Sequence, residues 1–336
     1  MPCPLLTLLL GALPMTTSLA QTPLYAPPGM VTNDNWFAKS GDTYHAFYLC
    51  VPKCMGDVND WSQRGKFTEI GHATSKDLVH WTDQGPVVVP IPGTWHSQLA
   101  TGSVAQFGGK WWMIYTSAGT PPGLALAVSD DLMTWKLVGD KPVVPFQAFD
   151  AEWQGKPIKW VPMADPYLYP EPIDGWMVMV INSRVEGAPE NSHGCLPTLR
   201  SKDMLNWEPG PVLAYPEWVE RPETPQLWRH GDKWYLYYGA AHDQPEFAPK
   251  WLAEAPEGIR DHRRVNCVMV ADRFEGPYRH VPGKWWLDRM PDGRGGYIHK
   301  VLTGPDGNDV LITTTDGYLS PPYRVVYGDD GSVGLE

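Results

Sequence analysis

The chain has few basic residues, and after its first 20 residues it has no long hydrophobic run. Only 27 Lys and Arg stand against 38 Asp and Glu, which leaves a formal net charge of -11 over 336 residues. Such a chain repels the phosphates of nucleic acids and the surface of an anionic membrane. No later segment reaches the roughly 18 uninterrupted apolar residues that a membrane-spanning helix needs. We therefore expect neither nucleic acid nor a membrane as a partner of the mature chain.

Cysteine is scarce as well, with five residues in the chain. Loss of an N-terminal leader would remove Cys3 and leave Cys50, Cys54, Cys195 and Cys267. In an oxidising compartment these residues could form disulfides, and the sequence does not choose among the pairings. A zinc site built on Cys50 and Cys54 would need a second Cys or His pair at finger-like spacing, and none follows. We therefore predict no metal centre on these cysteines.

The first residues have the features of an export signal. Residues 5–20 hold a short apolar run followed by small residues, although no Lys or Arg precedes the run. Ser18-Leu19-Ala20 fits the small-x-small pattern for signal-peptidase cleavage before Gln21. The pattern predicts a signal peptide over residues 1–20 and a secreted or periplasmic protein. We expect residues 21–336 to fold as one domain.

Phenylalanine is rare relative to the other aromatic residues. The chain has 8 Phe against 17 Trp and 15 Tyr, together with 33 Gly and 35 Pro. Aromatic side chains suit the pleated surface of strands, and Gly and Pro form turns. The composition therefore favours an all-β protein with many short strands over a helical bundle.

One pattern, S-x-D-[LM]-x-x-W, recurs along the chain. Its copies lie at residues 75–81, 129–135 and 201–207, with a degenerate fourth copy at 271–278. Ahead of the copies lie aromatic or apolar segments that predict strands in the middle of a sheet. These segments are residues 44–48, 111–115, 176–180 and 234–238, with a fifth at 310–314 and an outer strand at 323–327.

The repeats divide the chain into five units that begin near residues 32, 101, 164, 222 and 297. Units of roughly 50 to 70 residues are long enough for four antiparallel strands, which predicts a five-bladed β-propeller with four-stranded blades around a central channel. A two-sheet sandwich is the competing all-β architecture, but it does not predict one motif recurring at blade spacing. We expect the proline-rich residues 85–93 and 208–216 to be outer loops between blades.

Three carboxylates occupy nearly the same position in three of the predicted blades. Asp165 and Glu223 each lie 11 residues before the aromatic second strand, and Asp34 lies 10 residues before it. Because the first strand of each blade lines the channel, these side chains should converge there. The alternative is that Asp34-Asn35 and Asp165-Pro166 are ordinary turn pairs. Convergence would repel like charges and desolvate them, which is typical of a functional site.

Glycoside hydrolysis needs such a set of carboxylates. One protonated carboxyl donates a proton to the leaving oxygen, while an ionised one attacks the anomeric carbon or activates water. Glu223 suits the acid and Asp34 the nucleophile or base, and Asp165 could tune the pKa of the acid. Glu220 precedes a proline in the same way and is a rival for the acid.

Several of these segments resemble glycoside hydrolase family 32. The similar segments are Thr32-Asn33-Asp34 with residues 41–48, residues 71–81, Gly102-Ser103, Ala164-Asp165-Pro166 (Arg-Asp-Pro in the family) and residues 223–228 (Glu-Cys-Pro in the family). Residues 223–228 are equally similar to the Glu-Gly-Pro of family 43. Both families are five-bladed propellers. The resemblance implies a glycosidase in which Asp34 is nucleophile or base, Asp165 a substrate clamp or pKa modulator, and Glu223 the acid.

The expected substrate is an oligo- or polysaccharide with a terminal or side-chain furanoside, such as fructosyl or arabinosyl, or a xyloside. Sugar sites add aromatic and polar groups around the carboxylates. The candidates for substrate binding are Asn33, Trp36, Ser103, Arg221 and His299. No cofactor is required, although the resemblance to family 43 suggests a structural calcium near His299. The alternative function is a non-catalytic propeller that binds carbohydrate or a protein.

Overall fold

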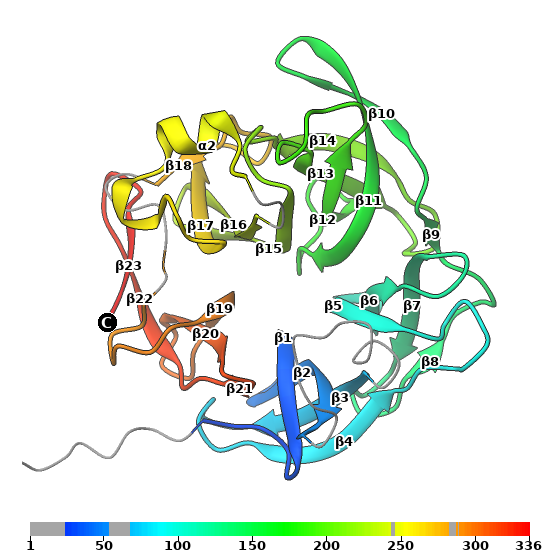
Figure 1. Ribbon diagram of the computed structural model, residues 1–336. Helices are drawn as coiled ribbons and strands as arrows, with labels where there is room; N and C mark the ends of the chain where they lie inside the picture. The colour runs from blue at the N-terminus through cyan, green and yellow to red at the C-terminus, as the bar shows by residue number, and fades with distance from the viewer. Residues whose placement is uncertain (1–23, 54–67, 243–245, 282–286, 288) are drawn as a thin grey trace, which may run out of the picture.

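The computed structural model describes residues 24–53, 68–242, 246–281, 287 and 289–336. In these residues five antiparallel sheets stand in a ring around a central channel, as the sequence predicted (Figure 1). The first principal strand of each sheet lies nearest the axis in Figure 1. These inner strands are β1 (Met30–Ser40), β5 (Leu99–Phe107), β11 (Lys156–Leu168), β15 (Arg221–His230) and β19 (Tyr297–Thr303).

The aromatic segments form the second strand of each blade and are buried between neighbouring blades. They are β2 (Thr43–Pro52), β6 (Lys110–Ser117), β12 (Met177–Val185), β16 (Lys233–Ala241) and β20 (Asp309–Thr315). Five hydrophobic clusters fill the space within and between the sheets. Burial on both faces explains why the central residues of these strands are mainly apolar and do not alternate.

The outer strands are shorter and complete each blade. The third strands are β3 (Glu69–Ser75), β7 (Gly123–Ser129), β13 (Gly194–Ser201), β17 (Arg264–Ala271) and β22 (Tyr323–Tyr327). The fourth strands are β4 (Thr82–Val88), β8 (Lys136–Leu137), β14 (Glu208–Ala214), β18 (Arg279–His280) and β23 (Val333–Leu335). Three blades carry a fifth strand, namely β9 (Val144–Pro145), β10 (Phe149–Trp153) and β21 (Tyr318–Leu319). The fourth blade also carries α2 (Pro249–Glu254) and the 3₁₀ turn η2 (Glu257–Ile259).

The recurring motif is a turn that leaves the third strand of a blade. In its second copy, Ser129 Oγ accepts the backbone N–H of Leu132 at 2.9 Å, and Asp131 Oδ1 accepts those of Met133 at 2.9 Å and Thr134 at 2.8 Å. The polar residues of the motif thus satisfy backbone donors that no strand partner reaches. Leu132 has a φ of 65° and is fully buried. The repeat therefore has a structural role in each blade, and it lies outside the channel.

The prediction for the proline-rich segments was wrong in part. Residues 85–88 belong to β4 and residues 208–214 to β14, the outermost strands of their blades. Proline cannot donate a ladder hydrogen bond, so it is tolerated at a sheet edge where no further strand pairs.

Three of the four cysteines considered for disulfides lie in the described part of the chain. Cys50, Cys195 and Cys267 are buried free thiols, so no disulfide forms among them. Cys54 and the predicted signal peptide lie outside the described residues. No helix among the described residues has the length and apolar character needed to cross a membrane.

Candidate functional site

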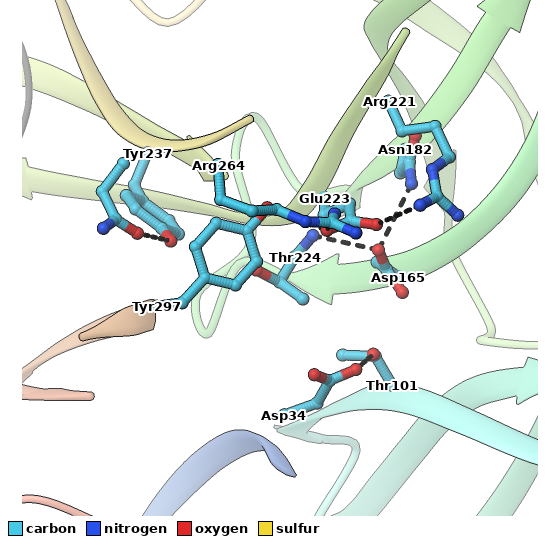
Figure 2. Close-up of polar contacts among 11 residues, drawn as sticks. Asp34, Thr101, Asp165, Asn182, Arg221, Glu223, Thr224, Tyr237, Arg264 and Tyr297 are labelled. Atoms are coloured by element: carbon cyan, nitrogen blue, oxygen red, sulfur yellow. Dashed lines mark hydrogen bonds and ion pairs between the residues drawn. The ribbon is translucent and has the colours of Figure 1, made fainter. Parts of the chain in front are cut away.

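A pocket of about 940 Å³ opens on the channel and takes lining residues from all five blades. Asp34, Asp165 and Glu223 all line it, as the sequence register predicted. Figure 2 shows Asp34 on one side of the pocket, with Asp165 and Glu223 together on the other. A cavity of this size holds a sugar unit and its neighbour comfortably.

Irregularities in the inner strands bring these side chains into the pocket. The pairing register shifts between Asn33 and Asn35 in β1, around Asp165 in β11, and after Glu223 in β15. Asp34 has a φ of 27° and Asp165 a φ of 57°. A β-bulge inserts an extra residue and redirects a side chain out of the sheet. The strain of these left-handed residues is therefore located where the carboxylates meet.

Asp34 lies opposite the other two carboxylates and is held by the neighbouring blade. Thr101 Oγ1 of β5 donates a hydrogen bond to Asp34 Oδ2 (Figure 2). Asn35, next in β1, is fully buried and donates through its amide to Thr314 Oγ1 at 2.9 Å. These contacts fix the bulge of β1 from both adjacent blades.

Asp165 is nearly buried, and its Oδ2 accepts two hydrogen bonds. Asn182 Nδ2 of β12 donates at 3.2 Å, and the backbone N–H of Thr224 in β15 donates at 3.0 Å. Its own backbone N–H donates to Thr116 Oγ1 of the second blade at 3.0 Å. Two donors on one oxygen orient the carboxylate and leave the other oxygen for a ligand hydroxyl.

Glu223 lies among two arginines and a tyrosine. Its side chain is 17% exposed and contacts three donors: Arg221 Nη2 at 3.1 Å from Oε1, and Arg264 Nη1 at 2.6 Å and the Tyr297 hydroxyl at 2.8 Å from Oε2. Burial raises the pKa of Glu223 above its ordinary value, and the charge of Asp165 adds to this, while Arg264 and Arg221 oppose it. The net direction is upward, which favours the protonated carboxyl that a general acid needs.

Glu220, the rival for the acid, lies elsewhere. Its Oε2 accepts the backbone N–H of Asn191 at 2.9 Å and pairs with His193 Nδ1 at 2.9 Å. It is not among the pocket residues. Its contacts order a loop of the third blade, so the geometry favours Glu223.

Of the five residues predicted to bind substrate, Asn33 and Arg221 line the pocket and the other three do not. Trp36 is 2% exposed and stacks on Phe47, because the bulge at Asp34 turns it into the core between the first two blades. Ser103 is buried, and its Oγ accepts the backbone N–H of Leu168 at 3.0 Å. The prediction of a substrate contact at Trp36 and Ser103 was therefore wrong.

His299 is a buried structural residue and the third correction. Its Nδ1 pairs with Thr313 Oγ1 at 2.8 Å and its Nε2 with the Leu287 carbonyl at 2.6 Å. Burial lowers the pKa of His299 to about 4, so the ring is neutral. Both ring nitrogens are occupied by protein groups, so His299 offers no nitrogen to an ion. Within the described residues, no three His, Cys, Asp or Glu side chains gather as metal ligands.

The role of Ser103 gives a stability prediction. The Ser103→Ala variant should lower the free energy of unfolding by about 1–3 kcal/mol, because the buried N–H of Leu168 loses its acceptor. Urea denaturation measures this change. Ser40→Ala, at the exposed end of β1, is the control and should change stability by no more than about 0.5 kcal/mol. A loss of ligand binding by Ser103→Ala without a loss of stability would contradict the structural role.

Sequence reasoning missed five contacts of the carboxylates, among them Asn182, which lies in the second strand of its blade and donates to Asp165. Thr101 and Tyr297 lie two residues before the chosen Ser103 and His299, at the same strand starts, so a register counted through the bulges would have found them. Thr224 acts through its backbone N–H, which no side-chain pattern reveals. Arg264 begins the third strand of its blade, 41 residues after Glu223, and only the folded blade brings the two together.

The two functional hypotheses differed on how the carboxylates would lie. A site for hydrolysis requires that they converge on one pocket, and all three line it. A binding module would allow them to be neutralised by ion pairs, and Glu223 does pair with Arg221 and Arg264. Burial raises the pKa of Glu223 against the effect of these cations, which is the direction that a general acid needs.

Comparison with known families agrees with this geometry. The model of the glycosyl hydrolases family 32 N-terminal domain matches residues 25–217. The chain is 24% identical over 306 residues to sucrose-6-phosphate hydrolase of Escherichia coli, covering 89% of this chain and 57% of that protein.

Solved structures share the fold at lower identity. Sucrose-6-phosphate hydrolase from Lactobacillus gasseri superimposes with a TM-score of 0.66 at 18% identity, over 91% of this chain and 60% of that one. A thermostable family-43 glycoside hydrolase superimposes with a TM-score of 0.60 at 17% identity, over 93% and 96% of the two chains. The chain thus spans less than two thirds of the sucrose-6-phosphate hydrolases that it matches.

Proposed function

Because the chain belongs to glycosyl hydrolase family 32, we propose that it hydrolyses the glycosidic bond of a terminal or side-chain furanoside in an oligo- or polysaccharide, with a fructosyl unit as the first candidate. The observation that carries the proposal is the pair formed by Asp34 and Glu223 across one pocket. Glu223 is half-buried and has a raised pKa, and Asp34 faces it from another blade.

The acid role falls to Glu223. Its Oε2 accepts from Arg264 and Tyr297, whereas Oε1 lies at the longer distance of 3.1 Å from Arg221. We therefore assign the acidic proton to Oε1. In the reaction this proton passes to the glycosidic oxygen as the bond to the anomeric carbon breaks, and the leaving sugar departs as a neutral alcohol.

Asp34 supplies the negative charge on the opposite face of the sugar. Its carboxylate either bonds to the anomeric carbon, with water completing the reaction later, or takes a proton from water that attacks directly. Asp165, fixed by Asn182 and Thr224, is suited to hold sugar hydroxyls and to raise the pKa of Glu223 through its charge.

We also propose that residues 1–20 direct export. N-terminal sequencing of the protein from the medium or periplasm tests this, with Gln21 as the expected first residue.

The experiment that tests the function is a substrate panel. Purified protein is incubated with sucrose, fructans, arabinans and nitrophenyl furanosides and xylosides, and released sugar is identified by chromatography. We expect release of a monosaccharide from at least one furanoside. Sugar binding measured by calorimetry without turnover of any substrate would instead favour the non-catalytic propeller, in which the ion pairs of Glu223 are permanent.

Arg264 should set the alkaline limit of this activity. Its guanidinium is the strongest of the charges that lower the pKa of Glu223, so Arg264→Met should raise that pKa further. A general acid works only while protonated, so activity falls as the pH rises through the pKa. The alkaline limb of kcat/KM should therefore move to higher pH in the variant. Arg200→Met, which removes a surface arginine paired with Glu208, is the control, and a limb that moves to lower pH would contradict the assignment.

A further inference from the structure

Lys300 is a buried cation that the proposed reaction does not use. It lies in β19 three residues after Tyr297, it is 3% exposed, and it is not among the pocket residues. Its Nζ donates to the carbonyl oxygens of Thr224 at 2.7 Å and Pro225 at 3.4 Å. A buried ammonium costs free energy unless nearby groups compensate it, so its presence here needs a reason.

The carbonyls that Lys300 binds belong to the irregular part of β15. Pairing of β15 with β16 is interrupted between Glu223 and Gln226, and Thr224 has a φ of 46°. This segment carries Glu223 at one end, and its Thr224 N–H holds Asp165. A donor placed on the Thr224 carbonyl therefore fixes the peptide groups that set the position of two of the three carboxylates.

Joining the two blades does not by itself require a lysine. Gln226 already links β15 to β19, since its Nε2 donates to the Val301 carbonyl at 2.7 Å and its Oε1 accepts the Val301 N–H at 2.7 Å. A neutral side chain could supply one more hydrogen bond without the cost of burying a charge. The positive charge is thus the feature to be explained.

The charged groups around Lys300 are the carboxylates of the site. Asp34 of β1 and Asp165 of β11 raise its pKa, against burial, which lowers it to about 7. The Tyr237 ring of β16 lies 5.6 Å from Nζ, and the adjacent His299 is neutral. Coupling between two charges is mutual, so the ammonium favours the ionised form of Asp34 in return.

We propose that Lys300 is a positioning residue of the site, whose ammonium fixes the bulge of β15 at Thr224 and places a positive charge near Asp34 from behind the pocket. The inference rests on the proposed function for its kinetic consequence, and its electrostatic part stands without turnover. Three variants separate the two contributions. Lys300→Met removes donor and charge, Lys300→Gln keeps a donor without charge, and Lys300→Arg keeps both.

Kinetics with the substrate found in the panel give the first readout. Lys300→Met should lower kcat on the order of 10- to 100-fold with little change in KM, because misplaced catalytic groups slow the chemical step. The acidic limb of kcat/KM should move to higher pH in Lys300→Met and Lys300→Gln, since Asp34 loses a nearby cation. Lys300→Arg should restore the wild-type limb. Lys110→Met, at an exposed ion pair of the second blade, is the control for loss of one charge.

Carbon-13 NMR titration of labelled aspartate carboxyl groups gives a readout that does not need activity. The signal of Asp34, identified by its loss in Asp34→Asn, should titrate at higher pH in Lys300→Gln than in the wild type. Unchanged titration together with unchanged kcat would overturn the inference. An inactive wild type would refute the proposed function, while a shifted titration in the same sample would still support the role of Lys300. Thermal unfolding of each variant identifies any that does not fold. If Lys300→Met does not fold, the kinetics and titration of Lys300→Gln, the less disruptive variant, test the inference.

Discussion

The Asp34→Asn variant is expected to lose kcat on the order of 10⁴-fold, because an amide can neither attack the anomeric carbon nor accept a proton from water. The change is nearly isosteric, and an amide oxygen can still accept the hydrogen bond of Thr101. We therefore expect a folded protein with KM close to that of the wild type. The measurement is initial-rate kinetics on the best substrate of the panel.

Asp130→Asn is the matched control for this substitution. Asp130 makes a surface ion pair with Lys110 on the second blade, so the same chemical change there should leave kcat unaltered. Retention of more than a tenth of the wild-type kcat by Asp34→Asn would show that Asp34 is not the reacting carboxylate. The anomer of the sugar first released, followed by NMR, then identifies its role: retention assigns Asp34 as nucleophile, and inversion assigns it as base.

The fold was predictable because its determinants are local. Each copy of the motif closes a turn with its own Ser and Asp, as Ser129 and Asp131 do, and each aromatic segment forms a strand buried on both faces. The proline-rich edge strands escaped prediction because a strand that pairs on one side tolerates Pro. Their composition is that of a loop, and only the neighbouring strand shows that they pair.

The site was predictable where its side chains lie at a constant distance from a recognisable strand. Asp34, Asp165 and Glu223 have this property, because each lies at or directly before a bulge in its inner strand. Arg264 and Lys300 do not, since they act on the fourth blade from a different strand or a different blade. Charges that shift the pKa of a carboxylate need only be near it in space, so no spacing in the sequence predicts them.

Glu223→Gln is expected to lower kcat/KM by about 10²- to 10⁴-fold on substrates whose leaving group is a sugar. The alkoxide of a sugar is a poor leaving group and needs the proton of the acid, whereas a nitrophenolate departs without one. The loss should therefore be much smaller with a nitrophenyl glycoside of the same sugar. Comparing the two substrates separates a missing acid from a damaged pocket, because damage would reduce both rates alike.

The pH dependence should change with the same substitution. Burial raises the pKa of Glu223, so the wild type keeps its acid protonated to higher pH than an exposed glutamate would. Above that pKa the proton is lost and activity falls, which gives the alkaline limb. Gln cannot titrate, so the limb should disappear from the residual activity of Glu223→Gln towards the nitrophenyl substrate.

Glu220→Gln provides the control three residues away. Glu220 also precedes a Pro in this segment, but it holds Asn191 and His193 instead of facing the pocket. Its substitution should lower the unfolding temperature and leave both the leaving-group dependence and the alkaline limb intact. If Glu220→Gln and not Glu223→Gln shows the selective loss on sugar leaving groups, the acid has been misassigned. In that case the two arginines beside Glu223 would mark a permanently ionised carboxylate that binds substrate without donating a proton.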